Sequence, residues 1–283
     1  MARLLPDGSL DSRFRCRING RVVSLTEQAD GRLLVGGWFT GTEDRSTRGF
    51  VRLNADGSFD TSFRLEPGTD GRLASFVNAV RTLPDGRMLV GGYFETYNRS
   101  SVSNLVRLQP DGTLDESFPL TRSGVNNPVN TIQVLPDGRA YVGGYFTSVG
   151  GRAYRGLCRL TAEGAVDTRF RSVRPNAEIW DVLPLPNGQV LVAGAFTQIG
   201  GLARRYLALL NDDGSVDTSF DPGIGPNDHA FRLAALSDGT AWVAGSFTSY
   251  AGQPAPGIAR VRLPGITGSF TGITLRPDGT SEA

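Results

Sequence analysis

Val35-Gly-Gly-Trp-Phe39 is the stretch that decides the fold, because closely similar stretches recur at regular intervals along the chain. Each copy ends an apolar run with two small residues, one variable residue and a phenylalanine. The other copies are Val90-Gly-Gly-Tyr-Phe94, Val142-Gly-Gly-Tyr-Phe146, Val192-Ala-Gly-Ala-Phe196 and Val243-Ala-Gly-Ser-Phe247. A period of about fifty residues is typical of repeat architectures, in which each unit packs against its neighbours.

Two further features recur in every unit. An Asp-Gly type turn such as Pro84-Asp85-Gly86 precedes the small residues, and a second strand–turn–strand follows them, most clearly in Val51-Arg-Leu-Asn-Ala-Asp-Gly-Ser-Phe-Asp-Thr-Ser-Phe63. Asp-Gly is a strong hairpin signal because the turn needs positive φ, which glycine adopts without steric cost. Each unit therefore predicts four short strands, A to D. The units span residues 22–63, 77–118, 129–170, 179–220 and 230–270.

Strand B of each unit is apolar almost throughout, as in Val190-Leu-Val192. A strand without a polar side is buried on both faces, like the strands of a propeller blade that lies between two other blades. We predict an all-β protein, a single β-propeller domain over residues 1–283 with five four-stranded blades. Half units at 3–14 and 271–279 leave a six-bladed alternative open, in which they form a hybrid closing blade. A β-solenoid is the main rival, but its repeats are usually shorter.

The combined pattern PDG-(R)-xLVGG-x-F-T … RL-x-x-DGS-(L/F/V)-D-x-SF resembles the delta-60 repeat of bacterial β-propeller-like proteins, over nearly the whole chain. The resemblance implies the propeller fold but little about activity, since propellers carry many unrelated functions. The fourth unit departs from the pattern, with Leu209 where the first three have arginine (Arg52, Arg107, Arg159). The fifth has Thr267-Gly268 in place of the strand D aspartate, which bears on the closure of that unit.

Composition narrows the functional classes. The formal net charge of +1 gives no overall electrostatic reason to bind nucleic acid, although all 29 basic residues are arginines. No apolar run reaches the roughly 18 residues of a membrane span. The N-terminus has no apolar segment or cleavage site of a secretory signal. We therefore expect a cytoplasmic or assembly-associated chain without membrane insertion.

Catalytic and metal-binding groups are few. His229 is the only histidine, and no nucleophile motif accompanies it, so we expect a linker residue rather than a catalytic one. Cys16 and Cys158 are isolated and define neither a zinc site nor a disulfide framework. One aspartate recurs per unit, too far from the next to converge on calcium, and we expect it to accept hydrogen bonds from its own turn. These residues are Asp11, Asp60, Asp115, Asp167 and Asp217. The sequence predicts no catalytic residue, no metal and no cofactor.

Strand direction indicates where a binding surface lies. In a four-stranded antiparallel unit both Asp-Gly turns share one face, and the B–C loops and D–A linkers share the opposite face. The loops differ between copies whereas the turns are uniform, so we expect recognition on the loop face. For an anionic ligand the candidates are loop arginines, with solvated side chains as the alternative: Arg152, Arg155, Arg204 and Arg205. For stacking the candidates are aromatic residues, with packing between blades as the alternative: Trp38, Tyr93 and Tyr145.

Loop diversity without a catalytic set favours a non-enzymatic binding or assembly module. Its partner would be a protein, or an anionic or carbohydrate ligand. Two alternatives stay open at this point. The first is a structural component of a larger assembly, such as a cell-surface or virion protein. The second is a hydrolase that uses paired carboxylates in a central channel.

Overall fold

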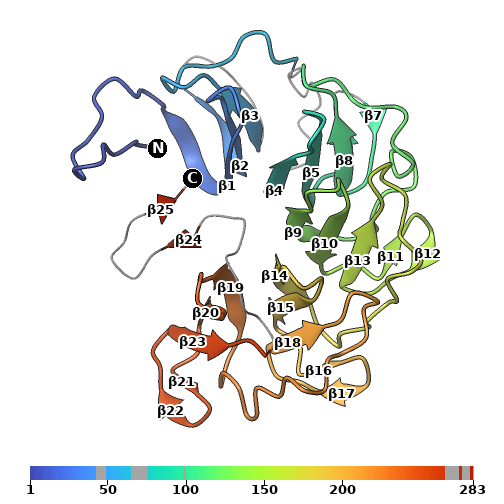
Figure 1. Ribbon diagram of the computed structural model, residues 1–283. Coiled ribbons are helices and arrows are strands. Elements are labelled where there is room, and N and C mark those ends of the chain that lie inside the picture. Colours follow the sequence, from blue (N-terminus) through green and yellow to red (C-terminus); the bar gives the residue numbers. More distant parts are fainter. Residues whose placement is uncertain (43–48, 65–75, 98–99, 265–273, 276–280, 283) are drawn as a thin grey trace. The chain divides into compact units, whose positions relative to one another are not determined.

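The computed structural model describes residues 1–42, 49–64, 76–97, 100–264, 274–275 and 281–282. Within these ranges every helix or strand assigned is a β-strand (Figure 1), so the all-β class predicted from the sequence is confirmed. This part of the chain accordingly holds no helix with the length and apolarity to cross a membrane.

Each repeat contributes strands A, B and C, and in the first, second, fourth and fifth repeats strand B lies between the other two. Strand B is apolar because both of its faces are covered: Leu34 and Val35 are fully buried, as are Leu191 and Val192. The strands in order of repeat are β1 (Ile18–Glu27), β2 (Leu33–Thr42) and β3 (Phe50–Leu53); β4 (Phe76–Thr82), β5 (Met88–Tyr93) and β8 (Leu105–Leu108); β9 (Val129–Val134), β10 (Ala140–Gly144) and β13 (Leu157–Leu160); β14 (Ile179–Pro184), β15 (Val190–Gly194) and β18 (Leu207–Leu210); β19 (Ala230–Ala235), β20 (Thr240–Gly245) and β23 (Ile258–Arg262).

The paired small residues at the end of strand B permit close packing on two sides. A Cβ atom at Gly36 would lie 2.7 Å from the Val77 side chain of the next repeat. A Cβ atom at Gly37 would lie 2.2 Å from the carbonyl oxygen of Arg21 in strand A. Real Cβ atoms do not approach so closely, which explains why this position of the repeat is held by the smallest residues.

Strand D is shorter than the sequence predicts. After the C–D turn of each of the first four repeats the chain pairs with strand C through a single β-bridge, such as Leu53 with Phe59. The next residue, Asp60, accepts a hydrogen bond from the Ser62 backbone N–H at 2.9 Å. This local hydrogen bond turns the backbone out of the sheet, so the regular pairing ends after one residue.

The B–C connections contain short hairpins that the sequence analysis did not predict. They are β6 (Thr96–Tyr97) with β7 (Ser100–Ser101), β11 (Ser148–Val149) with β12 (Arg152–Ala153), β16 (Gln198–Ile199) with β17 (Leu202–Ala203), and β21 (Ser249–Tyr250) with β22 (Gln253–Pro254). At one hairpin tip the Gly200 N–H donates to the carbonyl of Val173 in the D–A linker at 2.7 Å. The B–C loop and the D–A linker therefore lie together, as predicted. The predicted separation of the C–D turns from these loops is wrong, because Tyr97 Oη of a B–C loop donates to the Gly112 carbonyl of a C–D turn at 2.6 Å.

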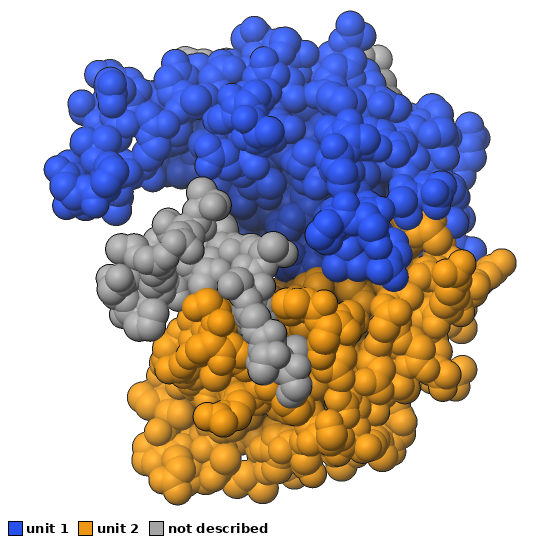
Figure 2. All heavy atoms as spheres, viewed as in Figure 1, with its two compact units in different colours: residues 1–139, 149–151, 162–165 blue, residues 140–148, 152–161, 166–283 orange. Residues whose placement is uncertain are grey.

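Two compact units divide the chain (Figure 2). Unit 1 comprises residues 1–139, 149–151 and 162–165, and unit 2 comprises residues 140–148, 152–161 and 166–283. The third repeat is divided between them, since β9 belongs to unit 1 and β10 and β13 belong to unit 2.

The two half units lie at opposite ends of the sequence. The N-terminal one, 3–14, belongs to unit 1 and forms a bridge between Leu4 and Leu10. The C-terminal one, 271–279, lies outside the described residues except for β24 (Thr274–Leu275), which pairs with β25 (Ser281–Glu282). The number of blades, the closing contact and the single-domain organisation over 1–283 therefore stay predictions.

Candidate functional site

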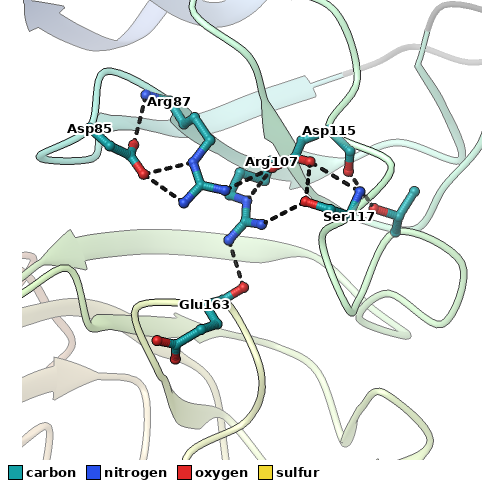
Figure 3. A network of polar contacts seen from close by, with 7 residues as sticks. Asp85, Arg87, Arg107, Asp115, Ser117 and Glu163 are labelled. Carbon is teal, nitrogen blue, oxygen red and sulfur yellow. Dashed lines mark hydrogen bonds and ion pairs between the residues drawn. The ribbon is translucent and has the colours of Figure 1, made fainter.

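A buried Arg–Asp pair joins strand C to the segment after the C–D turn in each of the first three repeats. In the second repeat Arg107 Nε donates to Asp115 Oδ2 at 2.7 Å, and the two side chains are 3% and 2% exposed. Arg107 also donates to the carbonyl of Glu163 at 2.7 Å, and Arg87 reaches the Asp115 carboxylate at 3.1 Å (Figure 3). The equivalent pairs are Arg52 with Asp60 and Arg159 with Asp167.

These arginines and aspartates were each recognised in the sequence as recurring residues, but their pairing was not predicted. Their constant separation of eight residues was the available signal. The fourth repeat supports a structural role, because there Leu209 replaces the arginine and Gln189 takes over, donating to Asp217 at 2.6 Å. The pairs therefore link strand C to the segment after the C–D turn within each of these repeats.

The recurring aspartates cap their own turns, as predicted. Asp115 accepts hydrogen bonds from the Ser117 backbone N–H at 3.0 Å and from the Ser117 hydroxyl at 2.6 Å. Burial alone raises the pKa of Asp115, but the hydrogen bonds from Ser117 and Arg107 outweigh it and lower the pKa to about 2. In the described ranges no group of three or more His, Cys, Asp and Glu side chains is placed to hold a metal ion.

An asparagine clamp, also missed from the sequence, fixes the B–C loop of three repeats. Asn176 Oδ1 accepts from the backbone N–H groups of Thr197 at 2.9 Å and Gln198 at 3.0 Å. Asn19 and Asn227 make the same contacts, each three residues before its repeat unit begins at Val22 or Ala230. The start of strand A and the end of strand B are therefore held in one geometry, whatever residues stand there.

Those positions are the variable ones. We call them the A–B rim: the residue directly before the start of each repeat unit (22, 77, 129, 179 and 230), and the residue before the phenylalanine that follows strand B's small residues. In unit 1 the rim includes the cross-strand pairs Arg21 with Trp38 and Phe76 with Tyr93. In unit 2 it comprises Tyr145, Glu178, Ala195, His229 and Ser246.

The rim of unit 1 carries an aromatic ladder, Trp38–Phe76–Tyr93, in which the two outer rings are exposed and Phe76 is partly buried. The ring centroids of Trp38 and Phe76 lie 4.9 Å apart, and those of Phe76 and Tyr93 lie 6.5 Å apart. Trp38 is 47% exposed and Tyr93 is 44% exposed. The Arg21 guanidinium lies 5.5 Å from the Trp38 ring centroid. Two of the three aromatic candidates thus come together, while Tyr145, in unit 2, is 58% exposed.

Hydrogen bonds through Asn78 hold the Trp38 ring of the ladder in place. Trp38 Nε1 donates to Asn78 Oδ1 at 3.2 Å, and Asn78 Nδ2 donates to the Val129 carbonyl at 2.9 Å. Asn78 lies where the register of β4 against β5 shifts, a β-bulge between Val77 and Ala79. Sequence analysis missed Phe76 and Asn78, and the signal for Phe76 was its place directly before Val77, opposite Tyr93.

The rim of unit 2 brings a serine, an aspartate and the only histidine together without forming a catalytic triad. Ser246 Oγ donates to Asp228 Oδ2 at 2.9 Å, and His229 Nε2 lies 3.8 Å from Asp228 Oδ1. The His229 ring packs against Tyr206, with centroids 5.4 Å apart. Activation of a serine requires its hydrogen bond to reach the histidine, but here the serine donates to the aspartate. The arrangement does not activate Ser246.

The four candidate arginines have different surroundings. Arg152 and Arg205 are exposed, and Arg155 is exposed while its guanidinium donates to the Asn176 carbonyl at 3.3 Å. Arg204 is neither an exposed candidate for an anion nor a solvated side chain. Its side chain is only 11% exposed and lies 3.9 Å from Asp221, because the D–A linker that follows Phe220 packs beside the B–C loop. An acid distant in sequence is therefore close in space.

Comparison with known proteins supports the β-propeller class. The family model described as domain of unknown function (DUF5122) β-propeller matches residues 28–63, 83–118, 135–170, 185–220 and 236–263. The first four matched segments run from the A–B turn to the phenylalanine that ends the repeat. No curated protein is similar in sequence to the chain.

Several solved structures share the fold at low sequence identity. Streptogramin B lyase gives a TM-score of 0.57 at 14% identity, covering 98% of this chain and 80% of that chain. The WD40 β-propeller domain of Doa1 gives 0.51 at 16%, covering 83% and 66%. PorZ, a bacterial surface component of the type-IX secretion system of Porphyromonas gingivalis, gives 0.50 at 15%, covering 90% and 35%.

These likenesses extend to the fold alone. They confirm the predicted β-propeller class, and the chain spans about two thirds of the Doa1 chain and about a third of PorZ. An enzyme and a surface component stand among them, so the common fold does not specify an activity. Function has to be argued from this chain's own residues.

Proposed function

This chain belongs to the DUF5122 β-propeller family, and from that premise we propose that it is a non-enzymatic binding module whose A–B rim recognises a protein partner. The observation that carries the proposal is the aromatic ladder of Trp38, Phe76 and Tyr93 in unit 1, in which Trp38 and Tyr93 are exposed. The narrower assignment to the delta-60 repeat, and a place within a larger assembly, belong to the same proposal.

The residue types of the ladder support a protein partner. Trp, Tyr and Arg are the residues most enriched where truncation costs an interface the most binding energy. The ladder supplies Trp38 and Tyr93, with Arg21 against the indole. Single exposed apolar residues are normal on a protein surface, but three contiguous rings beside an arginine form the kind of patch that interfaces use.

The rigidity of the rim also supports binding. Trp38 is oriented by Asn78, and Asn78 is itself bonded to the Val129 backbone. A side chain that is already ordered loses little rotamer freedom when a partner covers it, so more of its contact energy appears as affinity.

A capture experiment with matched variants tests the proposal. Trp38→Ser/Tyr93→Ser removes the two exposed rings, and Leu25→Ser is the control, because Leu25 is 53% exposed in β1 of the same unit but lies outside the ladder. Partners are captured from a lysate and from a surface fraction of the source cells. We expect a partner that binds the unaltered chain and Leu25→Ser but is lost with the double variant.

Loss of affinity by about 30-fold or more per ring is expected, since truncating an interface anchor costs about 2 kcal/mol or more. A partner retained equally by the double variant would place recognition elsewhere. Capture of a polysaccharide instead of a protein would replace the protein partner with a carbohydrate.

A further inference from the structure

A pocket of about 630 Å³ lies in unit 2, and no rim residue lines it. Its walls come from the D–A linker that follows the third repeat, from the tip of the β16–β17 hairpin, and from the C–D turn of the fourth repeat. The linker supplies Arg171 and Arg174, the hairpin supplies Gly200 and Gly201, and the turn supplies Gly214 and Ser215. Two arginines and no acidic residue line it.

Arg174 stands in a backbone conformation that its side chain does not favour. Its φ is 44°, in the left-handed region where glycine is the usual residue. The position is two residues before the asparagine that precedes strand A, and in the flanking linkers it is occupied by Gly124 (φ 46°) and Gly225 (φ 55°). The two flanking linkers place glycine at this positive φ, whereas this linker places an arginine there.

Nothing within the described chain explains that choice. The Arg174 side chain is exposed, and no hydrogen bond, ion pair or ring contact joins it to another described residue. A strained residue is retained when it does something the unstrained one cannot, and strain of this kind concentrates at functional sites. The neighbouring Arg171 is 68% exposed and pairs with Asp213 at 2.9 Å, an exposed contact that a bound anion can replace.

We propose that this pocket binds an oxyanion, a phosphate or sulfate group, through Arg171 and Arg174. Arginine presents its N–H donors in a planar fork that matches tetrahedral oxyanions, and two guanidinium groups on one short linker can contact different oxygens of one group. The volume of the pocket exceeds that of a free oxyanion, so it also has room for the small molecule or chain to which the group is attached. The site is independent of the aromatic ladder.

Unit 1 contains a pocket of similar construction that lacks these features. It measures about 710 Å³ and is lined by Arg15 and Arg17 of the N-terminal linker, but also by Asp11. Arg17 is two residues before Asn19, yet it is not among the residues with positive φ, and it has a partner of its own. Arg15, which like Arg171 directly follows the terminal phenylalanine of its repeat, therefore provides a matched control.

The test is isothermal titration of the full chain with inorganic phosphate at low ionic strength, with sulfate as a second arm and chloride as the reference anion. Arg174→Gly restores the residue used in the flanking linkers, so we expect its melting temperature to equal or exceed that of the unaltered chain. Its affinity for phosphate should fall at least tenfold. Arg171→Ser should also weaken binding, whereas Arg15→Ser and Trp38→Ser/Tyr93→Ser should leave it unchanged.

Arg174→Asn repeats the test with a residue that also tolerates positive φ, in case the glycine loosens the linker. Saturable binding of phosphate or sulfate that is lost in both variants supports the proposal, and the arm with higher affinity identifies the oxyanion. Absence of binding to either anion, or equal binding by Arg174→Gly and Arg174→Asn, overturns it.

Discussion

Replacing Arg107 with leucine removes the cation from the buried network of Figure 3 while keeping an apolar stem in the space it fills. The substitution deletes the 2.7 Å bond to Asp115, the 2.7 Å bond to the Glu163 carbonyl, and the contact of the guanidinium with the Phe118 ring at 5.0 Å. Asp115, which is 2% exposed in the unaltered chain, would lose its closest cation.

The expected loss of unfolding free energy depends on the contacts that remain around the Asp115 carboxylate. Breaking a buried ion pair by removing one partner costs about 3–5 kcal/mol. Arg87 still reaches Asp115 at 3.1 Å, and Ser117 still donates two hydrogen bonds. The fourth repeat folds with Leu209 at this position and Gln189 bonded to Asp217. We therefore expect a loss near the lower end of the range, about 3 kcal/mol in the free energy of unfolding.

Urea unfolding followed by tryptophan fluorescence measures this loss. Trp38 is the only tryptophan of unit 1, so a Trp180→Phe/Trp242→Phe background reports on that unit alone. Arg13→Leu is the control, because Arg13 is 82% exposed and pairs with Asp11 at only 3.4 Å, a contact worth less than about 1 kcal/mol. A loss below about 1 kcal/mol for Arg107→Leu would refute the structural role given to the Arg–Asp pairs.

Two other predictions concern the same framework. The pKa of Asp115 lies at about 2, below its ordinary value of 3.8, so its ionised form stabilises the fold above pH 4. About 2 kcal/mol of the free energy of unfolding is therefore lost as the pH falls towards 2. Unfolding free energies measured over this pH range should show a smaller loss in Asp115→Asn. Gly86 has φ 83° and an added Cβ would meet only ordinary contact, so Gly86→Val should lower unfolding free energy by about 1–2 kcal/mol through backbone strain alone, and should leave partner capture unchanged.

The repeat, the strands and the grouping of loops could all be predicted from the sequence, because each depends on short-range pattern. Asp-Gly marks a turn wherever it stands, and the apolar run before Gly36 marks a buried strand. Strand D was predicted too long. Asp60 was expected to accept hydrogen bonds near its turn, but the sequence did not show that its bond to the Ser62 N–H ends the pairing with strand C after one residue.

The contacts that define the site depend on register and could not be read from the pattern. Phe76 completes the aromatic ladder only because β4 pairs with β5 so that it lies opposite Tyr93. The Arg204 guanidinium lies near the Asp221 carboxylate only because a linker packs beside a loop. In both cases the partners are far apart in sequence and the fold brings them together.

The central claim is that the ladder contacts the partner, and photo-crosslinking tests it most directly. A photoreactive benzoyl-phenylalanine is placed at Tyr93, and in a separate variant at Leu25, which is similarly exposed on the same unit. The account predicts that the captured protein crosslinks covalently from position 93 and not from position 25. Crosslinking from position 25 but not from position 93 would contradict it.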